Sequence, residues 1–175
     1  MILNTIQTAS VVVGIIYYLT IMRNSHKARQ AQMLMQLHES KYDLEGMLSY
    51  FTLLNTSWED FDDYFKRYSR IPNPEFQAKM ESQMSYYEGL GVLVKNKMVD
   101  VNTIHDMMGS RIMSVWMKFE TVIRGWREKT EGPGPDYCEN FEYLADEIIK
   151  LRLQKGLPLN VHHIHPTSQQ FQRET

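Results

Sequence analysis

Residues 110–129, SRIMSVWMKFETVIRGWREK, are the most regular amphipathic stretch of the chain. Apolar side chains recur in this stretch at the i, i+3, i+4 and i+7 spacing that places them on one face of a helix. These are Ile112, Val115, Trp116, Phe119, Val122, Ile123 and Trp126. The spacing predicts a helix with one buried side, which we expect to be the central core element of an all-α domain.

The segment before this helix contains two further predicted helices. Asn73 followed by Pro74 is a typical helix start, and it predicts a helix over residues 74–95. A short helix over 101–108 should follow, capped by Asp100 and ended by Gly109. The buried stripe of the 74–95 helix is predicted to be Phe76, Met80, Met84, Tyr87, Leu90, Gly91 and Val94.

The segment after the central helix predicts one more helix, over residues 137–155. Asp136 should cap its start, and Gly156 with Pro158 should end it. Its inward positions are predicted to be Phe141, Leu144, Ala145, Ile148 and Leu151. No stretch shows the sustained alternation of a strand, so the sequence predicts a small helical bundle.

A short aromatic helix is predicted ahead of this bundle. Ser57 can cap its start, with Asp60 as the acidic partner three residues later. Its aromatic side chains fall on one face at helical spacing: Trp58, Phe61, Tyr64, Phe65 and Tyr68.

The N-terminal residues 1–22 are uncharged and include the apolar run Val11–Ile16, which only Gly14 interrupts. About 21 residues at 1.5 Å each span roughly 30 Å, the thickness of a bilayer core. The sequence therefore predicts a transmembrane anchor over 1–22. A buried or oligomerising helix and a cleaved signal peptide are the alternatives, although the positive charges follow the apolar run instead of preceding it.

The positive charges that follow this run are Arg23, Lys27 and Arg29. Their position predicts a single-pass membrane protein with the N-terminus outside and the C-terminal domain in the cytoplasm. The same cluster could bind anionic lipid at about 1 kcal/mol per residue, which is an alternative function. With the domain inside, the Asn55-Thr56-Ser57 glycosylation pattern should stay unused.

Residues 23–55 are predicted to continue the anchor helix as a stalk with a narrow apolar stripe. Such a helix would fray alone, so we expect it to pair with another helix or with a second copy of itself. The predicted organisation is an anchor at 1–22, a stalk at 23–55, a helical domain at 56–156 and a mobile tail at 157–175.

Composition excludes several classes of function. The chain has 175 residues and a net charge of −2, so its overall charge does not favour binding to nucleic acid. Cys138 is the single cysteine, so no disulfide can form within the chain. No phosphate-binding, dinucleotide-binding or nucleophile-elbow motif is present, and we expect no cofactor.

Glu88 is the first candidate for a special role, because it adjoins the predicted buried stripe. A carboxylate there needs a partner, and Arg111, Arg124 or Arg127 could supply a structural ion pair from a neighbouring helix. An enzymatic or ligand-binding site near Glu88 is the alternative. The neighbouring Gly89 and Gly91 weaken the helix, and we expect them to allow another helix to approach closely.

Other groups could bind metal or react, but the sequence pattern favours structural roles for them. Glu59, Asp62 and Asp63 fit a solvated helix start better than a cation site. Cys138 lies in the first turn of a predicted helix, which could lower its pKa, although no histidine partner is evident. Three tail histidines could bind a transition metal loosely: His162, His163 and His165. We assign no metal or catalytic residue.

The segment from Tyr86 to Trp116 resembles the family known as domain of unknown function 4760. The resemblance rests on Tyr87-Glu88-Gly89-Leu90-Gly91-Val92-Leu93-Val94, Val99-Asp100, Gly109, Trp116, Arg127 and Phe141-Glu142-Tyr143-Leu144. It implies an N-terminal hydrophobic helix, a helical stalk and a small α-helical domain, and it brings no reaction with it. The predicted anchor, the stripe of the stalk, the aromatic-rich helical domain and the lack of a catalytic motif lead us to expect a non-enzymatic, membrane-anchored module that binds a protein partner or itself.

Overall fold

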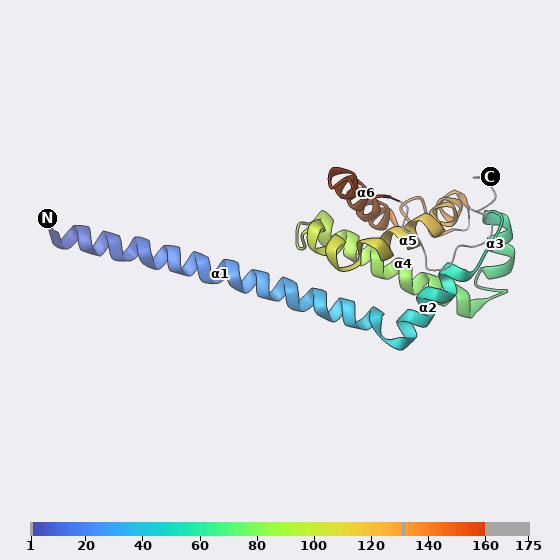
Figure 1. Cartoon of the computed structure of the whole chain (residues 1–175), viewed down its shortest axis with the longest axis horizontal. Helices are drawn as coiled ribbons and strands as arrows, with labels where there is room; N and C mark the ends of the chain where they lie inside the picture. Colours follow the sequence, from blue (N-terminus) through green and yellow to red (C-terminus); the bar gives the residue numbers. More distant parts are fainter. Residues whose placement is uncertain (1, 131, 160–175) are drawn as a thin grey trace. The chain divides into compact units, whose positions relative to one another are not determined.

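The computed structural model describes residues 2–130 and 132–159, without the side chains of residues 2–10 and of several residues between 26 and 40. The all-α prediction is confirmed, because every regular element among the described residues is a helix. The chain forms two structural units, Met1–Met47 and Leu48–Thr175. The helices are α1 (Ile2–Tyr42), α2 (Leu44–Asn55), α3 (Phe61–Tyr68), α4 (Pro74–Lys95), α5 (Val101–Glu128) and α6 (Glu139–Gln154) (Figure 1).

Helix α1 is continuous over 41 residues, so the predicted anchor and the first part of the predicted stalk are one helix. The stalk prediction over 23–55 is wrong at Asp43, where α1 gives way to α2. The Asp43 carboxylate accepts the N–H of Gly46 at 2.7 Å and caps the new helix. A side chain at Gly46 would lie 2.6 Å from the carbonyl oxygen of Lys41, so glycine is required at this bend.

Among the described residues, none of the helices combines the length and the apolar character needed to cross a membrane. Met1 and the side chains of residues 2–10, which form the first part of the predicted anchor, lie outside the described part of the chain.

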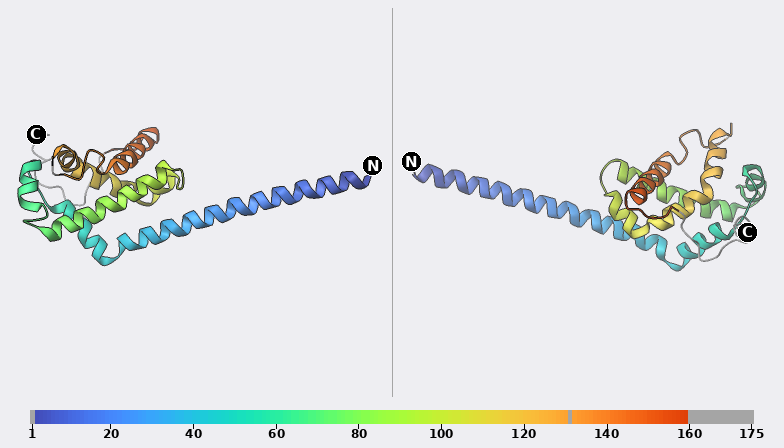
Figure 2. Two further views of the ribbon diagram at one scale, coloured as in Figure 1. Left: turned by 180° about the vertical axis from the view of Figure 1, so that it is seen from behind. Right: turned by 45° about the horizontal axis from the view of Figure 1, so that its top comes forward.

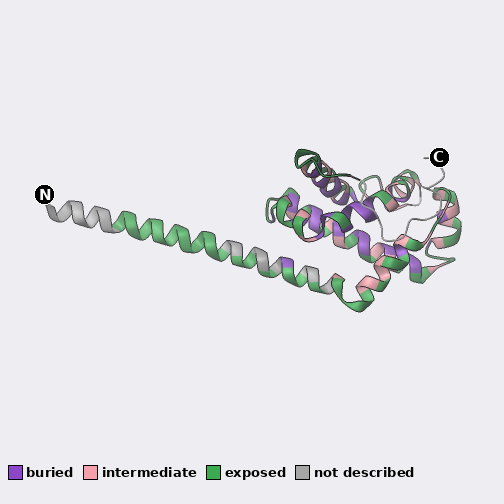
Figure 3. Ribbon diagram, in the orientation of Figure 1, coloured by how far each residue is buried: buried purple, intermediate pink, exposed green. Residues whose placement is uncertain are grey.

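The core of the second unit lies between α4, α5 and α6. Helix α6 packs against both α4 and α5, and the views in Figure 2 agree on this arrangement. The predicted stripe of α4 is buried throughout, and the inward faces of the three helices carry most of the buried positions (Figure 3). The predicted inward positions are confirmed except for Trp126 and Leu151, which are half-buried.

Helix α5 differs from its prediction. The expected short helix and the expected central helix are one element from Val101 to Glu128, with a kink at Met108, where φ is −149° and ψ is 16°. Gly109 does not adopt the positive φ of a terminating glycine. The chain re-enters the helix after one irregular residue because the side chains on both sides of the kink, Ile104 and Ile112, are fully buried in the same core.

The end of α6 confirms its prediction. Gly156 has a φ of +65°, the left-handed conformation that glycine adopts without a steric penalty. The N–H of Leu157 donates to the carbonyl of Arg152 at 2.8 Å, which closes a Schellman motif. The Arg152 guanidinium, which is buried, donates to the carbonyl of Pro158 at 2.6 Å and 3.0 Å and holds the following segment against the helix.

Helix α3 carries the predicted aromatic face but has a different cap. Asp60, not Ser57, is the N-cap residue, and its carboxylate accepts the N–H of Asp63 at 2.9 Å. The ring of Phe61 packs against Gly125 of α5, where a side chain would lie 2.3 Å from the ring. Glycine at this position lets α3 lie directly on α5, and the rings in contact there are Trp58, Phe61, Tyr64, Phe65, Phe119 and Trp126.

Candidate functional site

Glu88 caps a neighbouring helix. Its Oε1 accepts the backbone N–H of Asn140 at 3.2 Å and the side-chain amide of Asn140 at 2.7 Å. Its Oε2 accepts the backbone N–H of Phe141 at 2.8 Å. These two backbone groups are open donors in the first turn of α6, and a negative charge is favourable at that end of a helix. We call this arrangement the α6 cap.

The α6 cap replaces a local cap. The N-cap residue of α6 is Cys138, which has a left-handed φ of 58° and makes no side-chain capping bond. Asp136, the predicted cap, instead contributes its backbone carbonyl, which accepts the N–H of Glu139 at 3.0 Å. The predicted start at Tyr137 was therefore two residues early, and the missing cap comes from Glu88 on α4.

Gly91 makes the α6 cap geometrically possible. A side chain at this position would lie 1.9 Å from the carbonyl oxygen of Asn140, so only glycine lets α4 come this close to the start of α6. Gly89, in contrast, has no atom within 4 Å of the position that a Cβ would take. The prediction of a close helix approach is thus confirmed for Gly91 and wrong for Gly89.

The three arginines predicted as partners of Glu88 lie elsewhere. Arg127 donates to Glu142 at 2.6 Å and to the carbonyl of Tyr137 at 2.8 Å, so it joins α5 to α6. Arg124 forms ion pairs with Glu120 at 2.8 Å and with Glu142 at 3.5 Å. Arg111 is buried, and its guanidinium lies 4.2 Å from the centre of the Tyr50 ring. The Glu88 carboxylate therefore binds backbone N–H groups of α6 where an arginine was predicted.

Cys138 is buried beside the α6 cap. Burial raises the pKa of its thiol, and the charge of Glu88 raises it further, to about 12. The expectation that the helix start could lower this pKa is therefore wrong. At the N-cap position the thiol is 5% exposed, and removal from water outweighs the favourable helix dipole.

This shift predicts an unreactive thiol. At pH 8 a pKa of about 12 leaves about one molecule in ten thousand as thiolate. A disulfide reagent should therefore label Cys138 at least about 100-fold more slowly in the folded protein than in denaturing urea. The folded-state rate should keep rising with pH above 9, whereas the unfolded-state rate should level off near the ordinary cysteine pKa. Equal rates in the two states would contradict the buried position of the thiol.

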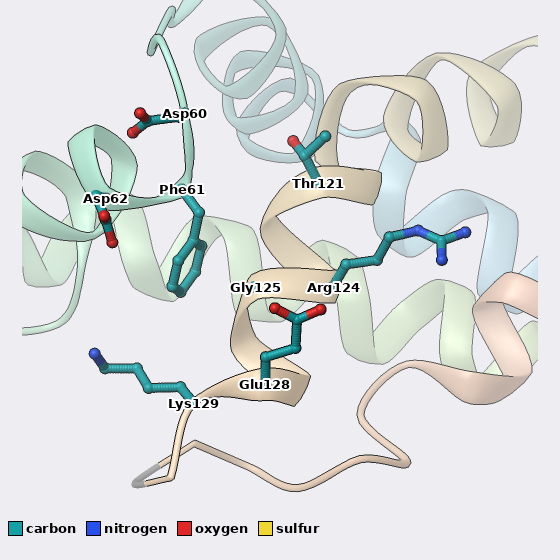
Figure 4. Close-up of a pocket in the computed structure, with 8 residues that line it drawn as sticks. All are labelled: Asp60, Phe61, Asp62, Thr121, Arg124, Gly125, Glu128 and Lys129. Atoms are coloured by element: carbon teal, nitrogen blue, oxygen red, sulfur yellow. The ribbon is translucent and has the colours of Figure 1, made fainter.

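The acidic residues at the start of α3 have different surroundings. Asp63 accepts from Arg67 at 2.9 Å and from the N–H of Glu59 at 3.2 Å. Asp62 instead lines an open cavity of about 530 Å³ between α3 and α5. Figure 4 shows the Arg124 side chain extending away from Asp60 and Asp62 in this cavity. Within the described part of the chain, no three metal-binding side chains gather.

A second cavity, of about 480 Å³, was not predicted from the sequence. It is lined by Arg70, Pro74, Gln77, Ala78, Glu81, Trp126 and Pro133. A chain of hydrogen bonds runs along it. The Tyr64 hydroxyl donates to Gln77 at 3.0 Å, and the Gln77 amide donates to Glu81 at 2.9 Å. Gln77, a polar residue beside the predicted apolar stripe of α4, is the sequence feature that could have pointed to this cavity.

The indole nitrogen of Trp126 completes the polar lining of this cavity. It is buried and makes no hydrogen bond of normal geometry with any described atom. It lies near the Tyr64 hydroxyl, whose pKa it lowers slightly against the larger increase that burial causes. The tail histidines at 162, 163 and 165 lie outside the described residues.

The fold and these contacts define an all-α protein in which a long N-terminal helix precedes a small domain built on a capped α4–α6 junction. A family model described as "Domain of unknown function (DUF4760)" matches residues 4–148. The chain belongs to this family, as the motif around Glu88 and Gly91 implied. No curated protein and no solved structure matches the chain.

Proposed function

We propose that this protein is a membrane-anchored, non-enzymatic helical module that associates with a second copy of itself or with another protein. The observation that supports an anchor is the apolar surface of α1. Val11, Val13, Ile16 and Tyr17 each expose more than half of their surface, and they lie on different sides of the helix. A helix that is apolar on all sides needs an apolar environment.

The proposed span combines this described surface with the uncharged residues 2–10. Residues 11–22 alone would cover about 18 Å, so a full crossing requires both parts. Arg23 and Arg29 follow at once, are exposed, and favour the cytoplasmic side. The proposed topology therefore keeps the N-terminus outside and the second unit in the cytoplasm.

An apolar stripe on α2 supports association. Leu48 and Phe51 lie three residues apart on one helix face, and their side chains are 58% and 45% exposed. A second α2 helix with the same stripe would cover these side chains, which is the contact we propose.

The proposal predicts that the protein resists carbonate extraction from membranes and gives a discrete cross-linked dimer or hetero-complex. Leu48→Glu combined with Phe51→Glu should reduce the cross-linked species by about tenfold, because charges at an apolar contact must be desolvated. Met117→Glu combined with Leu153→Glu is the matched control, since both side chains are exposed and lie off the stripe.

Two results would refute the proposal separately. Release of the protein by carbonate as a soluble species would refute the proposed membrane anchor. A clean monomer in native membranes, with no co-purifying protein, would refute the proposed association. Glycosylation of Asn55 would contradict the proposed topology, because that topology places this exposed residue on the cytoplasmic side.

A further inference from the structure

The cavity lined by Gln77, Glu81 and Trp126, which we call the Glu81 cavity, contains a carboxylate held in a fixed position. Tyr137 donates to both oxygens of Glu81 at 3.2 Å, and Gln77 donates to its Oε1 at 2.9 Å. Gln77 is 8% exposed and itself accepts from the fully buried Tyr64, so this donor to Glu81 is fixed by the core. The carboxylate cannot turn away from the cavity without breaking these bonds.

Within the described part of the chain, the charge of Glu81 is not matched by a cation. Among the described residues, no lysine, arginine or histidine nitrogen lies within ion-pair distance of it. The tyrosines beside it respond to this uncompensated charge. Burial is the main cause of the raised pKa values of Tyr64 and Tyr137, and the charge of Glu81 adds to both. A half-buried carboxylate of this kind favours a cationic group from outside the described chain.

Arg70 lies at the rim of the same cavity. It lines the cavity, is exposed, and is not within ion-pair distance of Glu81 or of any other described carboxylate. One cavity therefore presents an acidic group and a basic group that do not satisfy each other. A ligand that carries one positive and one negative group would satisfy both.

We infer that the Glu81 cavity binds a small zwitterion of the amino-acid class, with its ammonium group on Glu81 and its carboxylate facing Arg70. The apolar part of the ligand would lie against Ala78 and the indole of Trp126. The volume of about 480 Å³ falls within the range of small-molecule sites. This inference concerns a cavity in the second unit and does not depend on the proposed membrane anchor or on self-association.

The experiment uses the full chain in mild detergent, labelled with 5-fluorotryptophan. The chain has three tryptophans, and a Trp126→Phe variant assigns the resonance of Trp126. Glycine, L-leucine and L-phenylalanine are the amino-acid probes. Isoamylamine is leucine without its carboxylate, and 4-methylpentanoate is leucine without its ammonium group. We expect at least one amino acid to shift the Trp126 resonance to saturation, with about tenfold weaker binding of each half-ligand.

Two variants and a control complete the test. Glu81→Gln and Arg70→Gln should each weaken binding about tenfold, and Arg70, being exposed, can be replaced without disturbing the core. Glu75→Gln, on the same helix but outside the cavity, should leave binding unchanged. The inference is overturned if none of the three amino acids gives a saturable shift, if isoamylamine binds as tightly as leucine, or if Arg70→Gln has no effect.

Discussion

Replacement of Gly91 by alanine should lower the free energy of unfolding of the second unit by about 2–4 kcal/mol. The new Cβ would lie 1.9 Å from the carbonyl oxygen and 2.4 Å from the carbonyl carbon of Asn140. These are backbone atoms in the first turn of α6, so no side chain can rotate to relieve the overlap. Helix α6 must move away from α4, and that movement also lengthens the hydrogen bonds of the α6 cap.

The neighbouring Gly89 provides a control with the opposite sign. Both glycines lie in the interior of α4, where alanine is favoured over glycine by about 1 kcal/mol. At Gly89 no atom lies within 4 Å of the new Cβ, so Gly89→Ala should stabilise the protein by about that amount. Helix propensity alone would make both substitutions stabilising. Opposite signs would therefore show that the contact with Asn140 decides the effect at Gly91.

Urea unfolding of the full chain in mild detergent, followed by tryptophan fluorescence, measures both effects. All three tryptophans belong to the second unit, so the signal reports on that unit and not on α1. A stabilising Gly91→Ala substitution would contradict the close packing of α4 against the start of α6.

Replacement of Glu88 by alanine should lower the same free energy by about 2–3 kcal/mol. The substitution leaves the N–H groups of Asn140 and Phe141 without their acceptor and removes a negative charge from the positive end of α6. Cys138 cannot take over, because it has no capping bond to either group. Glu88→Gln should have an intermediate effect, since one amide oxygen can accept where two carboxylate oxygens did before.

Amide hydrogen exchange distinguishes this cause from a general loss of stability. The Asn140 and Phe141 amides should exchange faster in Glu88→Ala under conditions where the rest of α6 stays protected. Glu75→Ala is the matched control: its ion pair with Lys79 is exposed, so its removal should change stability by less than about 1 kcal/mol. Unchanged protection of Asn140 and Phe141 would refute the capping role.

Local patterns predicted the helices well where the signal lay within one segment. Asn73 and Pro74 gave the start of α4, and the bond from the Phe76 N–H to Asn73 at 3.0 Å confirms this cap. Gly156 gave the end of α6. At Met108 and Gly109 the same local rules predicted a break, but burial of side chains on both sides keeps the segment in one kinked helix.

The candidate site was less accessible from the sequence because its contacts join residues far apart in the chain. Glu88 was singled out, yet its partners are two backbone N–H groups and the Asn140 side chain, 52 and 53 residues later in the chain. The backbone groups carry no residue-specific signal. Arg127 and Glu142 formed part of the motif, and their ion pair appears only when α5 lies beside α6. The Glu81 cavity was missed because its lining comes from three separate stretches of the chain.

The sequence by itself determined the all-α class, the helix faces and the positions of most turns, because apolar periodicity and capping residues act over one or two helical turns. The tertiary structure alone decided which groups satisfy the open end of α6 and which charges remain uncompensated. Any carboxylate can accept from a free N–H group, so the choice of Glu88 depends on how closely Gly91 lets two helices approach. That distance is set by the packing of the whole core.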